Sequence, residues 1–413
     1  MKARVGLGLV LLLVTLGCGL LELVAPTRES VPATLPDPTT TATPVPPTVT
    51  MTPNPSPTPA ACPASQDLRP PTLTDSIEDN TAAIETYLDQ GGDAQRIPLG
   101  DQEMLLIGDL TGNGTPEIVV TLVDPLSQQI TPEGHMVVFT CQDGDVVQLY
   151  RYEPAEWYSL NLIALEDLNG DGVADLVFSD FSCGAHTCWH TPYVWSWGGD
   201  DFVSQIDAAL QFPYPDFHIE GDDLIVVSGG IGSVGAGPQR PVTTTLSWTG
   251  DFITVTAETT APPTYRYHAL VDGDLAFAAG DMVSAVALYQ RVVQDEVLTA
   301  WGAASSPEEE HDGLKALGQW RLVILNASGG DDAAAESSYA ALMASPQPLA
   351  VREAVKTLAE RFWRAYQRDG EVSSACVYAV DVEAAQTIVD FLYGFGYANP
   401  VFEQQDLCPH LRP

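Results

Sequence analysis

Oxygen-bearing side chains recur with the same spacing in two nine-residue segments, 109–117 and 167–175. They occupy positions 1, 3, 5 and 9, which are Asp109, Thr111, Asn113 and Glu117 in the first segment and Asp167, Asn169, Asp171 and Asp175 in the second. Position 6 is glycine in both. Carboxylate, amide and hydroxyl oxygens are the ligands that Ca2+ prefers, and glycine permits the tight turn that gathers them. We therefore predict that each segment is a calcium-binding loop in which the ion is structural.

The residues that follow these segments predict strands. Apolar runs come directly after each one, at 118–122 and 176–178. In helix–loop–helix calcium proteins a helix follows the loop instead, so we expect both loops to lead into strands. An ordinary hairpin turn rich in Gly, Asn and Asp is the alternative interpretation.

The two segments resemble the calcium loops of the FG-GAP/VCBS repeat family, whose members form the blades of integrin-like β-propellers. The resemblance covers about residues 100–260 and is stronger in the second segment, because the first has Thr111 and Glu117 at positions 3 and 9. It implies an antiparallel, propeller-blade-like β-domain, with a third unit that lacks a loop over 217–256. Two or three units are too few for an ordinary closed propeller of about 4–8 blades. The sequence therefore does not determine whether the sheets of the β-domain close into a ring.

Beyond residue 261 the composition changes from β-branched runs to Ala, Leu, Gln, Glu and Arg, which favours helices. Segment 276–291 resembles the turn of a tetratricopeptide repeat, because Gly280-Asp281 separates two helical runs and Ala285 and Tyr289 share one face. A weaker echo follows at 330–339. We predict helices over 77–90, 265–279, 282–297, 311–327, 332–344, 349–368 and 382–394. The predicted fold class is α+β multidomain, with a β-rich domain over 62–260 and an α-helical, tetratricopeptide-like domain over 261–413.

The first residues predict export. Lys2 and Arg4 precede an apolar run over 5–16, and Gly17-Cys18 follow directly after this run. A small residue followed by cysteine resembles the lipobox of bacterial lipoproteins, although Thr15 departs from that pattern, and the resemblance implies lipidation of Cys18. The alternative is an uncleaved membrane anchor that reaches residue 25 and is interrupted by Glu22. Either way, we expect the rest of the chain to be extracellular and membrane-anchored.

We divide the amino-terminal part into a lipoprotein signal peptide or anchor over 1–25 and a disordered linker over 26–61. The linker segment is rich in Pro and Thr and has almost no large apolar side chains, so it cannot bury enough surface to fold. The cysteines other than Cys18 fit disulfides in an exported protein. Proximity suggests Cys183–Cys188 and Cys376–Cys408, which leaves Cys62–Cys141, although the sequence alone does not fix the pairing.

The charge excludes some partners. Lys and Arg number 17 against 55 Asp and Glu, a net charge of −38, so we expect no binding of nucleic acid. The sequence shows no nucleophile-elbow, phosphate-loop or HExxH motif. The cysteines and histidines of segment 183–190 have the right chemistry for zinc, but an oxidising compartment favours a disulfide hairpin there.

We therefore expect a non-enzymatic, surface-tethered and calcium-stabilised lipoprotein that binds or scaffolds other molecules, with a helical protein-interaction domain. Its expected partners are the cell membrane, through the amino terminus, and a protein or glycan. The alternative is an exported hydrolase or carbohydrate-binding module that uses Trp195 and Trp197. These residues alternate along a predicted strand, so they face either a ligand or the core of the sheet.

Overall fold

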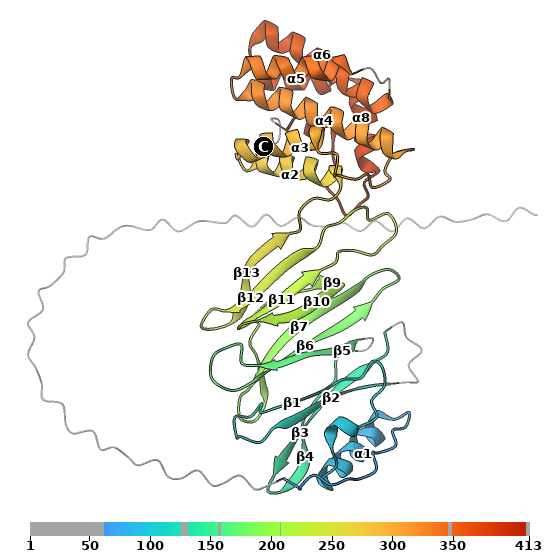
Figure 1. The fold of residues 1–413 in the computed structure, drawn as a ribbon, viewed down its shortest axis with the longest axis vertical. Helices are drawn as coiled ribbons and strands as arrows, with labels where there is room; N and C mark the ends of the chain where they lie inside the picture. The colour runs from blue at the N-terminus through green and yellow to red at the C-terminus, as the bar shows by residue number, and fades with distance from the viewer. Residues whose placement is uncertain (1–61, 125–130, 156–157, 207, 346–348, 410–413) are drawn as a thin grey trace, which may run out of the picture. The chain divides into compact units, whose positions relative to one another are not determined.

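The computed structural model describes residues 62–409, except for 125–130, 156–157, 207 and 346–348. The predicted signal or anchor segment with Cys18 and the predicted linker lie outside these residues. The described chain is α+β, with three antiparallel sheets followed by a group of helices (Figure 1). No helix in this described part is long and apolar enough to cross a bilayer.

Each sheet is a meander of consecutive strands. Sheet A consists of β1 (Leu105–Gly108), β2 (Glu117–Val123), β3 (Gly134–Gln142) and β4 (Asp145–Tyr152). Sheet B consists of β5 (Ser159–Glu166), β6 (Asp175–Cys183), β7 (Cys188–Trp197) and β8 (Phe202–Ser204), with β9 (Phe212–Pro213) also paired to β7. Sheet C consists of β10 (Pro215–Glu220), β11 (Asp223–Ser228), β12 (Val242–Trp248) and β13 (Ile253–Thr260). The described residues thus form three successive sheets and no closed propeller.

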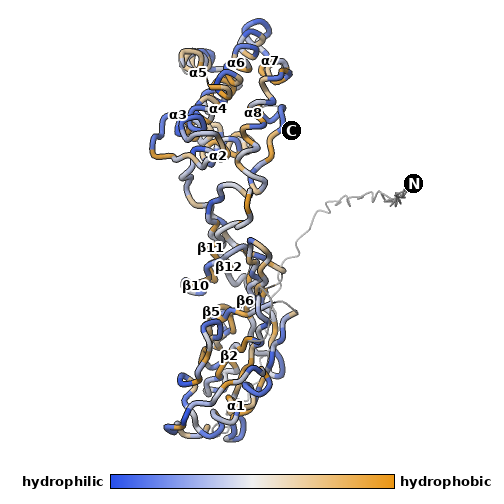
Figure 2. The backbone as a smooth tube through the Cα atoms, turned by 90° about the vertical axis from the view of Figure 1, so that its right-hand side faces the viewer, coloured by the Kyte–Doolittle hydropathy of each residue, from blue (hydrophilic) through white to orange (hydrophobic). Residues whose placement is uncertain are grey.

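Apolar side chains on both faces of the inner strands hold successive sheets together. On β6, Phe178 belongs to the core between sheets A and B, whereas its neighbour Val177 belongs to the core between sheets B and C. On β2, Val119 faces sheet B, whereas Val120 packs under helix α1 (Ile77–Asp89), which covers the other face of sheet A. Alternate residues of a strand point to opposite faces, so these strands are buried on both sides. Apolar residues accordingly recur throughout the strands and helices (Figure 2).

The helical part follows sheet C. Its helices are α2 (Arg266–Ala278), α3 (Met282–Gln294), α4 (Pro307–Ser328), α5 (Asp332–Ala344), α6 (Ala350–Asp369), α7 (Val372–Val380) and α8 (Glu383–Tyr393). The sequence pattern does not predict α7, and it places the start of α4 four residues too late. Helix α4 starts earlier because Ser306 caps it, with the hydroxyl accepting a hydrogen bond from the N–H of Glu309 at 3.1 Å, and proline fits the first turn.

The first two helical hairpins share one turn. Gly280 and Gly330 both have positive φ, at 78° and 74°, and the aspartate after each caps the next helix. Close packing within the first hairpin depends on Gly273, because a Cβ atom there would lie 2.5 Å from a ring carbon of Tyr289. The glycine therefore allows α2 and α3 to approach.

A buried ion pair joins three parts of the helical region. Arg321 on α4 donates to Asp274 on α2 at 2.9 Å, and their side chains are 0% and 3% exposed. Asp274 also accepts a hydrogen bond from the hydroxyl of Tyr289 on α3 at 2.7 Å. Arg321 donates further to the backbone carbonyls of Asp406 and Leu407, beside the Cys376–Cys408 disulfide. The arginine therefore links two helices to the carboxy-terminal segment.

We predict that Asp274→Ala lowers the free energy of unfolding of the helical part by about 3–5 kcal/mol, because it leaves the Arg321 charge buried without its partner. Urea unfolding followed by circular dichroism measures this loss. Glu360→Ala is the control, since it breaks an exposed pair with Arg364 and should change stability by less than about 1 kcal/mol. Equal losses in the two variants would contradict the role given to the buried pair.

Candidate cation-binding loops

The two predicted loops occupy the same place in successive sheets. Loop 1 (residues 109–117) joins β1 to β2, and loop 2 (residues 167–175) joins β5 to β6. The acid at position 9 is the first residue of the second strand in each sheet, and both acids are buried, Glu117 at 0% and Asp175 at 1% exposure. In sheet C a two-residue turn, Gly221-Asp222, takes the place of the loop. The structure therefore gathers each predicted set of residues into one loop that leads into a strand.

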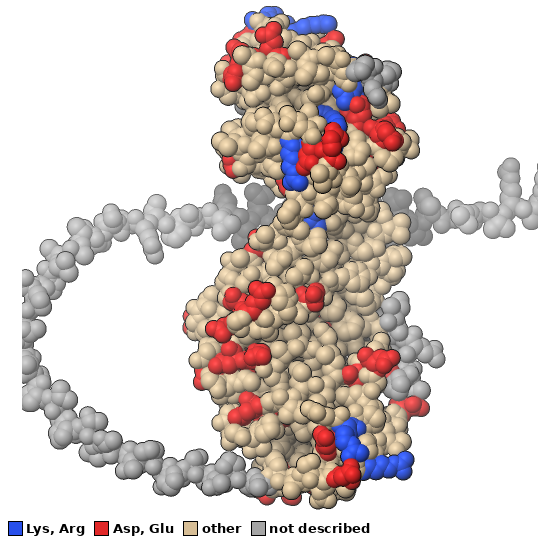
Figure 3. Space-filling view, viewed as in Figure 1, with Lys and Arg blue, Asp and Glu red and all other residues tan. Residues whose placement is uncertain are grey.

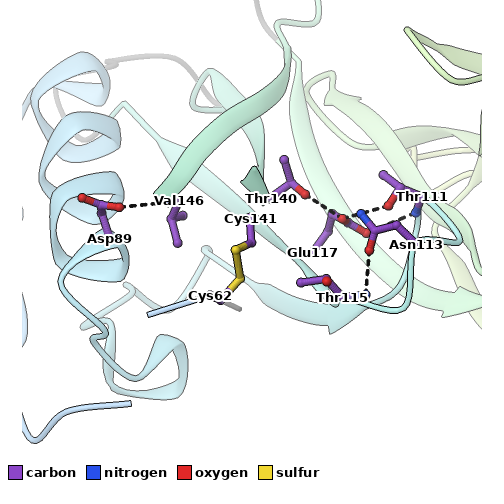
Figure 4. Close-up of a disulfide and its surroundings, with 9 residues drawn as sticks. All are labelled: Cys62, Asp89, Thr111, Asn113, Thr115, Glu117, Thr140, Cys141 and Val146. Atoms are coloured by element: carbon purple, nitrogen blue, oxygen red, sulfur yellow. Dashed lines mark hydrogen bonds between the residues drawn. A yellow bond between two sulfur atoms is a disulfide. The ribbon is translucent and has the colours of Figure 1, made fainter. Parts of the chain in front are cut away.

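Loop 1 is folded around its own polar side chains, of which Figure 4 draws Thr111, Asn113 and Glu117. Glu117 accepts hydrogen bonds from the N–H groups of Leu110 at 2.8 Å and Thr111 at 3.1 Å, and from the Thr111 hydroxyl at 3.1 Å. Asp109 accepts from the N–H of Gly114 at 2.9 Å. Asn113 accepts from the N–H two residues later, at 2.6 Å. The oxygen-bearing side chains thus fix the path of the loop backbone.

Loop 2 has equivalent bonds at these positions, and Oδ1 of Asp167 also accepts from the N–H groups of Gly170 at 2.8 Å and Asp171 at 3.1 Å. Asp175 accepts from the N–H of Leu168 at 2.9 Å, as Glu117 does from Leu110. Asp167 accepts from the N–H of the position 6 glycine at 2.9 Å, and Asp171 accepts from the N–H at position 7 at 2.8 Å. Asn169 at position 3 donates its amide N–H to Asp175 at 3.1 Å. The two loops are therefore structural equivalents as well as sequence repeats.

Glycine is required at two positions of each loop. Residues at positions 4 and 6 have positive φ, and these are Gly112 at 69°, Gly114 at 84°, Gly170 at 76° and Gly172 at 89°. A side chain disfavours this backbone conformation. The repeated glycines therefore set the turn that collects the oxygens.

A hydroxyl group on the neighbouring strand holds the position 9 acid in both sheets. Thr140 on β3 donates to Glu117 at 2.8 Å, and Ser196 on β7 donates to Asp175. The strand registers, each continued by one residue, place these residues opposite the two acids. The spacing within the loops does not reveal these two hydroxyl residues, because they follow the acids by 23 and 21 residues. Once the strand register is known, Thr140 and Ser196 can be recognised as the hydroxyl residues that lie opposite the acids.

Sheet C provides a comparison without a loop. Its register, continued by one residue, places Ser247 opposite Asp223 at the start of β11. The Ser247 hydroxyl instead lies 2.8 Å from that of Thr256. The bond between hydroxyl and acid therefore accompanies the loops and is not a general feature of these sheets.

The loops retain oxygen atoms suited to a cation. Oδ1 of Asp109 is buried and has no hydrogen-bond partner, which costs about 1–3 kcal/mol for an uncharged group and more for a charged one. In loop 2, burial raises the pKa of Asp175, assisted by the nearby Asp171 charge and opposed by the bonds from Ser196 and Leu168. A positive ion would satisfy the oxygen of Asp109 and offset the crowded charge of loop 2. The residues present therefore fit a hard cation.

Carboxylates alone do not form a complete metal site. Within the residues that the structure describes, no group of three or more His, Cys, Asp or Glu side chains is arranged to hold a metal ion. Loop 1 has only two carboxylates, and all five carboxylates of the two loops also accept backbone hydrogen bonds. Calcium commonly takes 6–8 oxygen ligands, so the hydroxyl or amide side chains, backbone carbonyls and water would supply the rest.

The described cysteines form Cys183–Cys188 and Cys376–Cys408, as proximity suggested, and Cys62–Cys141, the pair that remained. Cys62–Cys141 lines a cavity of about 280 Å3 beside loop 1, close to Thr115 in Figure 4. In Cys183–Cys188, both sulfurs are bonded to each other, and the nearby His190 stacks on Phe181 with ring centres 4.7 Å apart. This geometry is a disulfide hairpin beside an aromatic stack rather than a zinc site.

Trp195 and Trp197 occupy different surroundings. Trp195 belongs to the core between sheets A and B, with its ring centre 4.7 Å from that of Phe178 and 5.0 Å from that of Tyr152. Trp197 packs edge-on against Phe202 at 5.1 Å. This packing favours a core role for Trp195 over a platform for sugar or peptide.

No protein-family model matches this chain, and a search of curated proteins finds no match. Function is therefore inferred from the loops, the disulfides and the helical part.

His190 makes stability depend on pH. Burial lowers the pKa of His190 from its ordinary value of 6.5 to about 4. The His190 imidazole therefore binds a proton less readily in the folded protein than in the unfolded chain. The contribution of neutral His190 to the free energy of unfolding is fully present above pH 6.5, and it is lost as the pH falls toward 4. We predict that His190→Phe, which preserves the ring stack, reduces the loss of the urea midpoint between pH 7 and pH 5.

His268 and His311 also have lowered pKa values, so part of the loss will remain in the His190→Phe variant. The control is His218→Gln at a histidine whose side chain is 42% exposed, and its pH dependence should match that of the unmodified protein. An unchanged pH dependence in His190→Phe would contradict this assignment.

Proposed function

We propose that this chain is an exported, surface-tethered protein that binds or scaffolds other molecules, and that Ca2+ bound in loops 1 and 2 stabilises its β-rich part. The buried, unpartnered Oδ1 of Asp109 is the observation that carries the calcium proposal. It lies in a loop whose other side-chain oxygens are gathered by hydrogen bonds to the backbone.

The side chains proposed to hold the ions are those at positions 1, 3, 5 and 9. They are Asp109, Thr111, Asn113 and Glu117 in loop 1, and Asp167, Asn169, Asp171 and Asp175 in loop 2. Bound calcium would supply positive charge to groups of carboxylates that otherwise repel one another. The hydroxyls of Thr140 and Ser196 hold the position 9 acids in place, and they are the kind of outer partner that orients a metal ligand.

We further propose that the sheets are blade-like units of the FG-GAP/VCBS type. Support comes from the meander order of each sheet and from the loops between the first and second strands of sheets A and B. The helical part is proposed to be tetratricopeptide-like and to contact a protein partner. The repeated glycine–aspartate turns and the close approach at Gly273 support this comparison.

An extracellular location agrees with the chemistry of the described residues. Three disulfides suit an oxidising compartment. Acidic side chains are distributed over the face shown in Figure 3, whereas basic ones lie in few places. Such a surface repels nucleic acid and attracts cations. The proposed attachment is a lipid on Cys18.

We predict that EDTA lowers the melting temperature of the β-rich part and that added calcium restores it. Extracellular calcium modules bind at about 10⁻⁴–10⁻³ M, so calcium at about 1 mM should contribute roughly 0.4–1.4 kcal/mol per site. Differential scanning calorimetry of the full chain measures the change. A melting curve that EDTA and calcium both leave unchanged would contradict the structural role.

Terbium luminescence tests loop 2 directly. Trp195 and Trp197 flank Ser196, which bonds to Asp175, so Tb3+ in loop 2 should luminesce when tryptophan is excited. Asp167→Ala should remove most of this signal. Asp222→Ala is the matched control, because it changes an aspartate in the short turn of sheet C. Equal signals from the two variants would place the ion elsewhere.

The tether is tested separately from the calcium loops. We predict that the full chain, expressed in a bacterium, incorporates labelled palmitate and fractionates with the membrane. Cys18→Ser should abolish the label, because it removes the acylated thiol. Retention of the label in Cys18→Ser would contradict lipidation at this residue.

A further inference from the structure

Loops 1 and 2 touch each other, although they belong to different sheets. The N–H of Ala174, at position 8 of loop 2, donates a hydrogen bond to the backbone carbonyl of Asp109, at position 1 of loop 1, with an N–O distance of 3.3 Å. Val173 covers the turn of loop 1, since a Cβ atom on Gly112 would lie 2.8 Å from one of its methyl carbons. Asp109, the first residue of loop 1, is therefore bonded to Ala174, which directly precedes the buried Asp175 of loop 2.

The connection joins ligand-bearing parts of both loops. Asp109 carries the buried oxygen that lacks a partner, and Ala174 is adjacent to Asp175. Leu110, directly after Asp109, is 0% exposed and packs in the core between sheets A and B. The backbone carbonyl of Asp109 is therefore bonded to loop 2, while the side chain of the next residue is fixed in the core between the sheets.

We propose that the two loops act as one coupled pair, in which an ion in loop 2 increases the affinity of loop 1 through the contact between them, formed by the Ala174–Asp109 hydrogen bond together with Val173 over Gly112. This inference rests on the proposed calcium role. Loop 2 fills first, because it has three carboxylates where loop 1 has two, and ligand charge raises calcium affinity. The ion then fixes Val173 and Ala174, so that loop 1 loses less conformational freedom when it binds.

The chain contains the substitution that tests this route. Position 8 is Ala174 in loop 2 but Pro116 in loop 1, and proline has no N–H to donate. Ala174→Pro therefore removes the bond between the loops while it keeps every side-chain oxygen of both. Loop 1 shows that proline is accommodated at this position. Ala174→Ser is the matched control, because it retains the N–H.

Calcium titrations of the full chain, followed by NMR, measure the coupling. The amide signals of Gly114 and Gly172 report loop 1 and loop 2 separately, because each donates to the position 1 aspartate of its own loop. Disabling loop 2 with Asp167→Ala should weaken calcium binding at loop 1 about fivefold in the unmodified and Ala174→Ser backgrounds, the low end of typical coupling. In the Ala174→Pro background the same change should alter it by less than about twofold.

The outcomes separate this inference from the proposed function. If both loops bind calcium and Asp167→Ala leaves the calcium affinity of loop 1 unchanged, the coupling is overturned and the calcium role stands. If the coupling persists in a folded Ala174→Pro protein, the hydrogen bond is not its route and the inference also fails. If neither loop binds calcium, both proposals fail.

A second variant covers the case in which Ala174→Pro does not fold. Val173→Ala removes the methyl groups that cover Gly112 and leaves all loop oxygens and the Ala174 N–H in place. A smaller dependence of loop 1 on loop 2 in this variant supports a coupling carried by the contact between the loops. Full dependence overturns it.

Discussion

The structure of the β-rich part depends on a buried acid at the start of an inner strand. Glu117 and Asp175 each accept a hydrogen bond from the N–H at position 2 of their loop and another from a hydroxyl on the next strand. One carboxylate thus ties the loop to two strands. Its burial is tolerated because these donors replace water.

The residue at position 2 links this polar arrangement to the apolar cores. The N–H groups of Leu110 and Leu168 bond to the buried acids, while their side chains are at most 1% exposed. Leu110 packs between sheets A and B, and Leu168 between sheets B and C. Movement of a loop would therefore disturb the contact between two sheets. In sheet C, where a short turn replaces the loop, the strands still form a meander, so the loops are not needed to pair the strands.

The loops and most elements could be predicted because their information is local. All the side chains that shape loop 1 from within lie in nine consecutive residues, and the glycine–aspartate turns mark the helical hairpins in the same way. Thr140 and Ser196 could not be found in this way, since their role depends on strand register. Likewise, the contact of Ala174 with Asp109 depends on how two sheets pack.

Helix α7 shows a different limit of local patterns. Its nine residues include three valines, which favour strands by propensity. Ala375, Cys376 and Ala379 are nevertheless buried in the helical core, and Cys376 is bonded to Cys408. Tertiary packing therefore outweighs propensity in this segment. Tertiary contacts also bury the carboxylate of Glu310 in the first turn of α4, which accepts hydrogen bonds from the N–H groups of 301–303 at 2.7 Å each.

The Cys62–Cys141 bond has a mechanical consequence. Cys62 lies ahead of α1, and Cys141 lies on β3, an inner strand of sheet A. A pull on the chain at Cys62 is transmitted by a covalent bond into a strand that is hydrogen-bonded on both sides. The fifteen-residue stretch ahead of α1 is thereby protected from being peeled away, because the load bypasses it. If such a protein were held by its amino terminus in moving fluid, the drag force would therefore act on an inner strand of sheet A.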